Sequence, residues 1–220
     1  AASDVYKRQA FITGTDTGVG KTYFTALWTQ SLRRAGVPAL ALKPVSSGDR
    51  SDAEMLRQAS EESLTLEEIN PIHFTAPLSP LAACRQSRKS FPHETLHRHL
   101  ESLQPKYPGP FLVEGVGGWR VPFDDQYGVR EWAVGLKLPV VVVARAGLGT
   151  LNHVLLTVDS ILQTRLPILG IVLNLYDSKN DEATQTNPGL LPKLTGLPVF
   201  LLPNGAQPPL EIPSWLNLSS

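Results

Sequence analysis

The stretch GTDTGVGKT, residues 14–22, limits the possible folds more than any other part of the chain. It follows a short apolar run that would end a strand at Phe11 and Ile12, and it precedes a segment with helical periodicity at residues 22–35. A strand, a glycine-rich loop and a helix in this order are typical of a phosphate-binding loop. The residues expected on the buried face of the helix are Phe24, Leu27, Trp28, Ser31 and Leu32.

The end of this stretch carries the chemistry of nucleotide binding. Lys21 would reach the β- and γ-phosphates and the Thr22 hydroxyl would bind Mg²⁺, while Gly18 and Gly20 allow backbone N–H groups to turn toward phosphate oxygens. Thr15 stands where the common pattern has its first glycine. A glycine-rich turn without a ligand is the alternative. Because no N-K-x-D segment that would read a guanine base is evident, the pattern gives no support for a GTPase.

Apolar strand-like runs alternate with helix-length segments along the chain, which predicts a single α/β domain of the P-loop type, with a mostly parallel sheet and helices on both faces. We expect a tag-like or disordered leader at 1–9, the domain at 10–207 and a Pro-rich tail at 208–220. Segments 43–48 and 69–80 are expected to be loops. The expected strands are 11–12, 39–42, 111–113, 138–144, 168–175 and 197–203, and the expected helices are 22–35, 52–59, 91–103 and 151–163.

Composition excludes several classes of protein. Lys plus Arg and Asp plus Glu both number 20, so the zero net charge gives no support for nucleic-acid binding or a polybasic membrane anchor. No apolar run is long enough to span a bilayer. The single cysteine, Cys84, cannot form an internal disulfide, which fits a reducing compartment, and we expect a cytoplasmic protein.

Polar side chains are expected at the carboxyl ends of the strands, where α/β sheets bind ligands. Glu114 ends an apolar strand and is a candidate Mg²⁺ ligand, because a carboxylate is rarely buried for packing alone. Asp52, and more weakly Asp49, could bind the metal or could cap the following helix. Lys43 ends the second strand, beside the phosphate-binding loop, where it could stabilise a transferring phosphoryl group.

The histidines at 93 and 97 are spaced i, i+4 and could face one metal ion. No third ligand is evident nearby, and the segment is amphipathic. A solvated helix face is therefore the favoured interpretation.

Six motifs together identify a resemblance: GTDTGVGKT, KPVSSG followed by Asp52, NPIHFTAPLSP, VEGVGGW, GLGTLNH and VLN. Their order is similar to that in the dethiobiotin synthetase family, over about residues 11–205. The resemblance implies a homodimeric P-loop enzyme that uses ATP and Mg²⁺. It would close a ureido ring on 7,8-diaminononanoate with CO₂ or bicarbonate as the carbon source, through a carbamate and a carbamic–phosphoric anhydride.

The resemblance also implies roles for single residues. Lys43, Lys21 and Thr17 would be catalytic, and Thr22, Asp52 and Glu114 would bind Mg²⁺. Substrate would contact Thr17, Ser47, Gly149, Thr150, Leu151 and Asn152, the last four on a helix start that the partner subunit contributes. The nucleotide would contact Gly18, Val19, Gly20, Lys21, Thr22, Tyr23, Asp52, Glu114, Gly115, Val116, Gly117, Asn174, Leu175, Pro203, Asn204 and Gly205.

The chain departs from the family pattern at Gly18, where many members have Glu, and in LPNG, which lacks an aromatic residue that some relatives carry. No tyrosine could be assigned to the substrate carboxylate, although Tyr176 is close in sequence. A plain helix N-cap at Thr150 is the alternative to an anion site there.

Two other functions remain as alternatives. A cobyric-acid-type amide-forming synthetase shares the loop but normally adds a glutaminase domain, for which the chain has no room. A MinD/ParA-like ATPase switch would carry a lysine five residues before Lys21, where this chain has Asp16, and would commonly end in a membrane-targeting helix.

Overall fold

The computed structural model describes residues 9–175 and 182–218. Its strands are β1 Ala10–Gly14, β2 Leu40–Leu42, β3 Val45–Ser47, β4 Ile72–Phe74, β5 Phe111–Glu114, β6 Val140–Arg145, β7 Ile168–Asn174 and β8 Val199–Leu202. Its helices are α2 Lys21–Arg34, α3 Ser51–Ala59, α4 Leu66–Ile69, α5 Pro80–Ser87, α6 His93–Leu103, α7 Val129–Leu136, α8 Thr150–Leu162, α9 Glu182–Thr195 and the 3₁₀ helix η1 Ser214–Leu216. Tyr176 and residues 1–8 of the leader predicted at 1–9 lie outside the described residues, whereas Gln9 is described and is fully buried.

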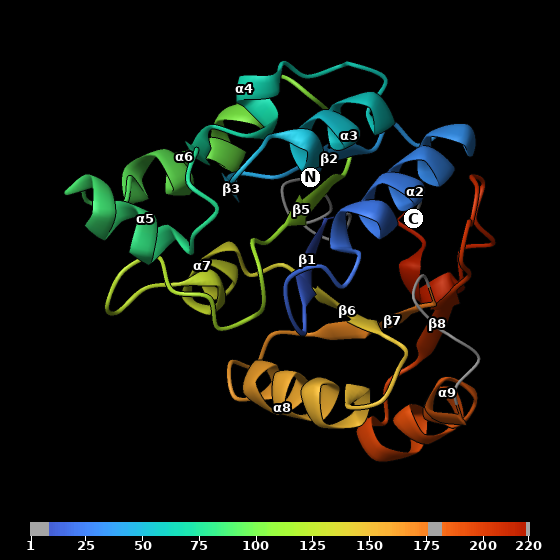
Figure 1. Ribbon diagram of the computed structural model, residues 1–220. Coiled ribbons are helices and arrows are strands. Elements are labelled where there is room, and N and C mark those ends of the chain that lie inside the picture. Colours follow the sequence, from blue (N-terminus) through green and yellow to red (C-terminus); the bar gives the residue numbers. More distant parts are fainter. Residues whose placement is uncertain (1–8, 176–181, 219–220) are drawn as a thin grey trace.

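Six of the strands form one parallel sheet in the order β2-β5-β1-β6-β7-β8 (Figure 1). α2 and α3 cover one side of this sheet in the view of Figure 1, and α8 and α9 lie on the other. The predicted fold class is therefore confirmed. Because all six strands run in the same direction, their carboxyl ends meet at one edge, where a ligand crevice is expected.

Side chains alternate between two cores along each central strand. Phe11 and Val142 belong to the larger core, with α7 and α8, whereas Ile12 and Val143 belong to the smaller core, with α2. All four residues are fully buried. This burial on both faces explains why β6 contains the uninterrupted run VVVV and no polar residue at alternate positions.

A second, two-stranded parallel sheet pairs β3 with β4, where the sequence predicted only loops. Val45 lies opposite Ile72 and Ser47 opposite Phe74. Three residues are too few to show a period, and the pairing depends on contacts between distant segments. Helices α4, α5, α7 and α9 were likewise not predicted; α4 has only four residues and begins with a capping box at Thr65 and Glu68.

The segment after β8 packs along α2. The Tyr23 hydroxyl donates to the carbonyl of Ala206 (2.7 Å), and Trp28 Nε1 donates to the carbonyl of Leu216 (3.1 Å). The backbone N–H of Leu210 donates to Ser31 Oγ at 2.8 Å. Residues 206–218 therefore close the outer side of the smaller core, to which Leu216 contributes a buried side chain.

Within the described ranges, none of the helices is both long enough and apolar enough to cross a bilayer.

Candidate active site

Three strand ends place the charged groups of the site. β1 leads into the phosphate-binding loop, β5 ends at Glu114, and Lys43 follows β2 directly. Register pairs Ile12 with Glu114 and Leu42 with Val113, so the lysine lies beside the glutamate. β5 lies between β2 and β1 in the sheet, so β2 is not the neighbour of β1. Lys43 nevertheless lines the same cavity as the phosphate-binding loop, as the sequence predicted.

The unusual glycine spacing of the loop has a steric explanation. A Cβ atom at Gly14 would lie 2.9 Å from the carbonyl oxygen of Asp16 and 3.0 Å from Lys21 Nζ. Lys21 Nζ in fact donates to that carbonyl at 3.0 Å. The loop therefore curls over Gly14 and has room for a side chain at Thr15. Gly20, at φ +93°, then forms the N-cap of α2, a conformation that glycine adopts without strain.

The ammonium group of Lys43 lies between two carboxylates. Its Nζ is 3.1 Å from Asp52 Oδ2 and donates a short hydrogen bond to Glu114 Oε1. The same Glu114 oxygen accepts a hydrogen bond from the Thr22 hydroxyl at 2.7 Å. The Lys43 side chain is 5% exposed and that of Glu114 is fully buried, whereas half of Asp52 is open to solvent. Residues from β2, β5, α2 and α3 thus form one connected polar group.

The pKa values of the two lysines of the site are shifted in opposite directions. Burial and, second, the charge of Lys43 lower the pKa of Lys21 to about 8. Burial also acts to lower the pKa of Lys43, but Glu114 and Asp52 outweigh it and hold this pKa above its usual value. Lys43 is therefore a permanent cation at neutral pH, and Lys21 gains from an anionic ligand that restores its preference for the charged form.

The donor set fits Mg²⁺. Thr22, Asp52 and Glu114 offer only hard oxygen ligands, as this ion prefers. Glu114 Oε2 is buried and has no hydrogen-bond partner among the described residues, so one carboxylate oxygen is left for a cation. Residues 9–175 and 182–218 contain no cluster of three or more His, Cys, Asp or Glu side chains arranged around a metal. The set of Thr22, Asp52 and Glu114 contains only two side chains of these four types, so it is not such a cluster.

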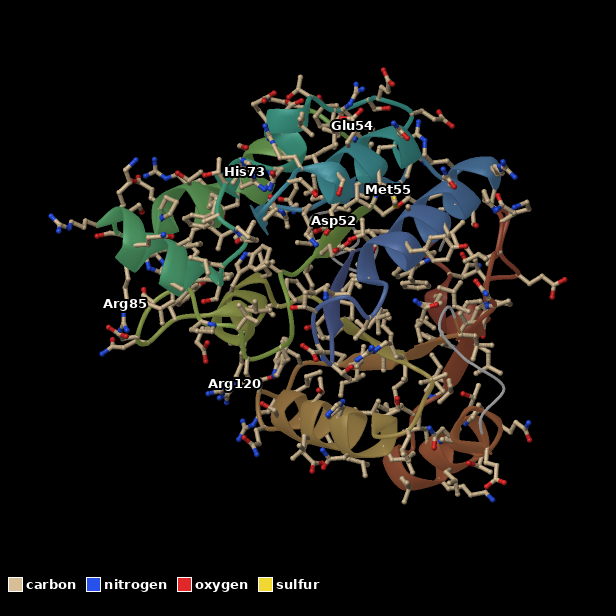
Figure 2. The ribbon with its side chains drawn as sticks, in the orientation of Figure 1. Asp52, Glu54, Met55, His73, Arg85 and Arg120 are labelled. Atoms are coloured by element: carbon tan, nitrogen blue, oxygen red, sulfur yellow. The ribbon has the colours of Figure 1, made fainter. Side chains whose placement is uncertain are left out.

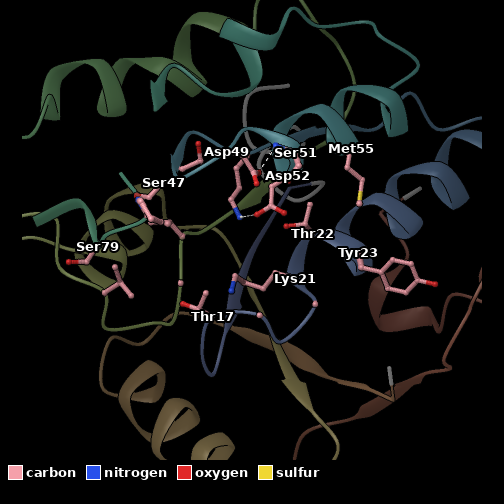
Figure 3. Close-up of a pocket in the computed structure, with 18 of the residues that line it drawn as sticks. Thr17, Lys21, Thr22, Tyr23, Ser47, Asp49, Ser51, Asp52, Met55 and Ser79 are labelled. Carbon is pink, nitrogen blue, oxygen red and sulfur yellow. Dashed lines mark hydrogen bonds and ion pairs between the residues drawn. The ribbon is translucent and has the colours of Figure 1, made fainter. Parts of the chain in front are cut away.

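A cavity of about 720 Å³ opens above these groups. Figure 3 shows Thr17 and Lys21 on one side of it and Ser47 and Asp52 on the other. The predicted residues that line it are Thr17, Gly18, Gly20, Lys21, Thr22, Tyr23, Lys43, Ser47, Asp49, Asp52, Val116, Gly117, Asn174, Asn204 and Gly205. Residues from five separate parts of the sequence are thus brought to one surface, with a volume suited to a nucleotide and a small substrate.

Other predicted residues lie outside this lining. Glu114 is buried behind Lys43 and Thr22, and Val19 is buried in the smaller core. Gly115, Leu175 and Pro203 flank lining residues without contributing to the lining itself. Gly149, Thr150, Leu151 and Asn152 are also absent from it; Thr150 lines a separate cavity of about 260 Å³ on the side of Asp16 and Arg145.

Three alternatives left open by the sequence are decided by contacts. Neither aspartate is the N-cap of α3, because Arg50 takes that position. Asp49 Oδ1 accepts a hydrogen bond from the backbone N–H of Ser51 at 3.0 Å, whereas Asp52 forms an ion pair with Lys43. Thr150 is not a helix N-cap: Gly149 takes that position, and the Thr150 hydroxyl donates to the carbonyl of Arg145.

The histidines of α6 bind protein groups. His93 Nε2 lies 2.6 Å from Asp124 Oδ2, and His97 Nε2 lies 2.7 Å from the Tyr127 hydroxyl. These two contacts hold the loop that follows the glycine-rich segment after β5. The metal-site alternative for this pair therefore has no support in the described structure.

The sequence missed part of the cavity wall. The additional residues are Ser46, Ser51, Met55, Pro77, Leu78, Ser79, Pro80 and Val121. Ser79 caps α5 by accepting a hydrogen bond from the N–H of Ala82 at 3.3 Å, which places the APLSP segment at the rim. Only its occurrence within a family motif signalled this segment, because proline-rich loops have no periodic pattern.

Similarity to known proteins agrees with this geometry. A family model described as an AAA domain matches residues 8–205. The ATP-dependent dethiobiotin synthetase BioD of Akkermansia muciniphila is 38% identical over 193 residues, which cover 88% of this chain and 90% of that protein. BioD of Anaeromyxobacter sp. (strain K) is 41% identical over 201 residues, covering 89% of this chain and 90% of that protein.

Among solved structures, the signal recognition particle receptor FtsY from Elizabethkingia anophelis aligns with a TM-score of 0.60 and 10% identity. The alignment covers 96% of this chain and 63% of the receptor chain, and at this identity it shows a likeness of fold alone. The high identity to the two BioD proteins, over nearly their full length, is far more specific: the chain belongs to the ATP-dependent dethiobiotin synthetase family.

Proposed function

We propose that this enzyme converts 7,8-diaminononanoate, CO₂ and ATP into dethiobiotin, ADP and phosphate. The observation that carries the proposal is the presence of Lys43 in the same cavity as the phosphate-binding loop. A nucleotide-binding site requires Lys21 and the loop alone. A second buried ammonium group, held on another strand, provides charge for a second anion beside the γ-phosphate.

The chemistry requires such an anion. One substrate amine attacks CO₂ and loses a proton to form a carbamate. A carbamate oxygen then attacks the γ-phosphorus and ADP leaves, and the second amine attacks the carbonyl carbon and loses a proton as phosphate departs. Bringing a carbamate to a triphosphate is electrostatically unfavourable, and Lys21, Lys43 and the N-terminus of α2 offset that repulsion. Ring closure is then intramolecular, so proximity supplies much of the rate.

Two hydroxyl groups are proposed to position the carbamate. Thr17 lines the cavity on the phosphate-binding loop and Ser47 lines it from β3. Ser47 Oγ is buried and has no hydrogen-bond partner among the described residues, which supports a role in binding a ligand. The two-stranded sheet that the sequence missed is therefore what holds Ser47 at the site.

Thr22, Asp52 and Glu114 are proposed to hold Mg²⁺, which when bound would neutralise phosphate charge. In the described structure Lys43 contacts both of these carboxylates. The lysine therefore supplies the positive charge that the buried Glu114 needs when no other cation is present.

The adenine base is proposed to lie between Asn174 and the 203–205 loop. Asn174 at the end of β7, Gly205 after β8 and Tyr23 on the first turn of α2 all line the main cavity. The Tyr23 hydroxyl bonds to Ala206, so the loop is fixed to the first turn of α2. Leu175 is tied to β8 by a hydrogen bond from its N–H to the carbonyl of Leu202 at 3.0 Å.

A homodimer is proposed, with the turn at 149–152 reaching the substrate of the partner subunit. The turn does not line the main cavity of its own chain. Around it, Leu148 is 92% exposed and Leu156 of α8 is 63% exposed, which is a large apolar area for a free surface. Light scattering of the purified protein would test this, since a monomer at micromolar concentration contradicts it.

A product assay tests the function as a whole. Purified protein is incubated with ATP, Mg²⁺, bicarbonate and the diamine, and dethiobiotin is sought by mass spectrometry, with each component omitted in turn. We expect ADP and cyclic urea in equal amounts, and neither without the diamine. Rapid ATP hydrolysis without the diamine would contradict the proposal and favour a MinD/ParA-like ATPase switch.

A further inference from the structure

A second cavity, of about 340 Å³, lies beside the main one. Thr17 and Val121 line both cavities, so the two meet at the place proposed for the reacting amines. The residues around the second cavity are Thr15, Asp16, Thr17, Gly118, Trp119, Arg120, Val121, Pro122, Leu156, Thr157 and Ser160. Nothing in the proposed phosphoryl transfer uses this space.

The lining of the second cavity combines an anion, apolar side chains and a cation. Asp16 supplies an anion on the phosphate-binding loop, Trp119, Pro122 and Leu156 supply apolar surface, and Arg120 supplies the only cation of the lining. Arg120 is exposed and makes no ion pair or hydrogen bond to any described residue. An unpaired guanidinium group at the edge of an apolar cavity is available to an anionic ligand.

The backbone that carries Arg120 is firmly held on both sides. The N–H of Trp119 donates to the carbonyl of Gly14 at 3.2 Å, and Trp119 Nε1 donates to Ser160 Oγ of α8 at 3.2 Å. Val121 N–H donates to the carbonyl of Gly118 at 3.1 Å. Figure 2 shows Arg120 at the outer margin of the molecule, beside α8. Its position is thus fixed relative to the phosphate-binding loop, with only the side chain left to adjust.

We propose that Arg120 binds the carboxylate of the diamino acid and so selects substrates with an anionic tail. This inference rests on the proposed function. The substrate carries two amines at one end, an apolar chain in the middle and a carboxylate at the other end. Asp16, the apolar wall and Arg120 match these three parts. Arginine suits the last one because its planar fork can donate two hydrogen bonds to one carboxylate.

Arg120 and the 149–152 turn would reach one substrate molecule from different subunits. The turn is proposed to act across a dimer interface, whereas Arg120 is on the same chain as the Thr17 that meets the amines. Each can contribute to binding of the same carboxylate, and a substitution on one leaves the other in place.

The test is the Arg120→Gln variant, assayed with the diamino acid and with its methyl ester. Since a hydrogen bond to a charged group contributes about 1.5–3 kcal/mol, the KM for the acid should rise about 10- to 150-fold. The KM for ATP and kcat should change little by comparison. With the ester, wild type and variant should have similar KM values. Arg130→Gln on α7, outside both cavities, is the matched control and should behave as wild type with either compound.

Two results would overturn the role of Arg120: an unchanged KM for the acid, or an equal rise for acid and ester. If wild-type protein forms no cyclic urea from the acid, the proposed function fails as well, and the product assay distinguishes this case. Calorimetric binding of the acid to wild type and Arg120→Gln provides a second measurement, independent of turnover. A drop in the unfolding midpoint of Arg120→Gln would point to a structural effect; we expect none, because the side chain is exposed and unpaired.

Discussion

The side-chain amide of Asn174 donates a hydrogen bond to the carbonyl of Val19 at 3.0 Å and so fixes the end of β7 to the phosphate-binding loop. The Asn174 side chain also leaves no space for a side chain at position 20. A Cβ atom at Gly20 would lie 2.0 Å from Asn174 Nδ2, far inside van der Waals contact. The proposed base-binding and phosphate-binding parts of the site are thus in direct contact before any ligand arrives.

Gly20→Ala should therefore destabilise the protein and weaken nucleotide binding. The added methyl group meets Asn174, and the backbone at φ +93° is unfavourable for alanine, so we expect a loss of about 2 kcal/mol or more in the free energy of unfolding. Gly18→Ala is the control: it also has positive φ, +71°, but no atom lies within 4 Å of its Cβ position. It should cost about 1 kcal/mol. Equal losses in urea unfolding would contradict the steric explanation.

Lys43→Met should affect both turnover and stability. Turnover should fall by about 100-fold or more, as for other preorganised cationic groups, while ATP binding is largely retained. Because the variant leaves the buried Glu114 without its partner, unfolding should also become easier by about 3 kcal/mol.

The double variant Lys43→Met, Glu114→Gln separates these two effects. Removing the orphaned charge should recover most of the stability but none of the turnover. Recovery of activity, or a near-normal rate in Lys43→Met alone, would mean that Lys43 has only a structural role. Product formation and thermal unfolding are the two measurements required.

His99 should make the protein sensitive to acid. Burial lowers the pKa of this imidazole below 6.5, although its hydrogen bond to the carbonyl of Glu68 opposes that shift. Between the lowered pKa and 6.5, the unfolded chain therefore binds more protons than the folded one, so stability falls as the pH drops through this range. One such group can contribute a slope of up to about 1.4 kcal/mol per pH unit.

The variant His99→Gln should reduce this slope, measured by urea unfolding at several values between pH 7 and 5. His153→Gln, on the exposed side of α8, should keep it. If both variants retain the full slope, the acid sensitivity arises elsewhere.

Trp28→Phe should loosen the segment after β8. The variant keeps the aromatic packing against Phe24 but loses the donor to the carbonyl of Leu216. We expect a cost of at least about 1 kcal/mol and faster limited proteolysis within residues 206–218, because the hydrogen bond is lost and the smaller phenyl ring leaves part of the buried indole volume empty. Phe24→Leu changes the same core without removing a hydrogen bond, so cleavage at the segment should increase less than in Trp28→Phe.

The sequence predicted the sheet well because its strands are buried on both faces. The run VVVV of β6 and the apolar β5 have few other structural interpretations once helical segments alternate with them. The same reasoning could not find β3 and β4, which have three residues each and include Ser46, Ser47 and His73. Their pairing is decided by tertiary contacts.

The sequence allowed many residues of the candidate site to be named, but it did not show which of them are in contact. Each of Lys43 and Glu114 was recognisable as a polar residue at a strand end. Their direct contact, across 71 residues of sequence, depends on the strand order, which no local pattern specifies. Arg120 gave no signal at all, because a single exposed arginine after a glycine-rich loop is common in proteins of any function.

The packing of residues 206–218 on α2 also has a consequence for biosynthesis. α2 leaves the ribosome early, but the residues that cover Trp28 are translated much later. Until then the nascent chain exposes the apolar side of the helix that follows the phosphate-binding loop, and chaperones would have a surface to bind. Crosslinking of chaperones to chains halted before residue 206 should therefore exceed crosslinking to chains in which residue 218 has already emerged.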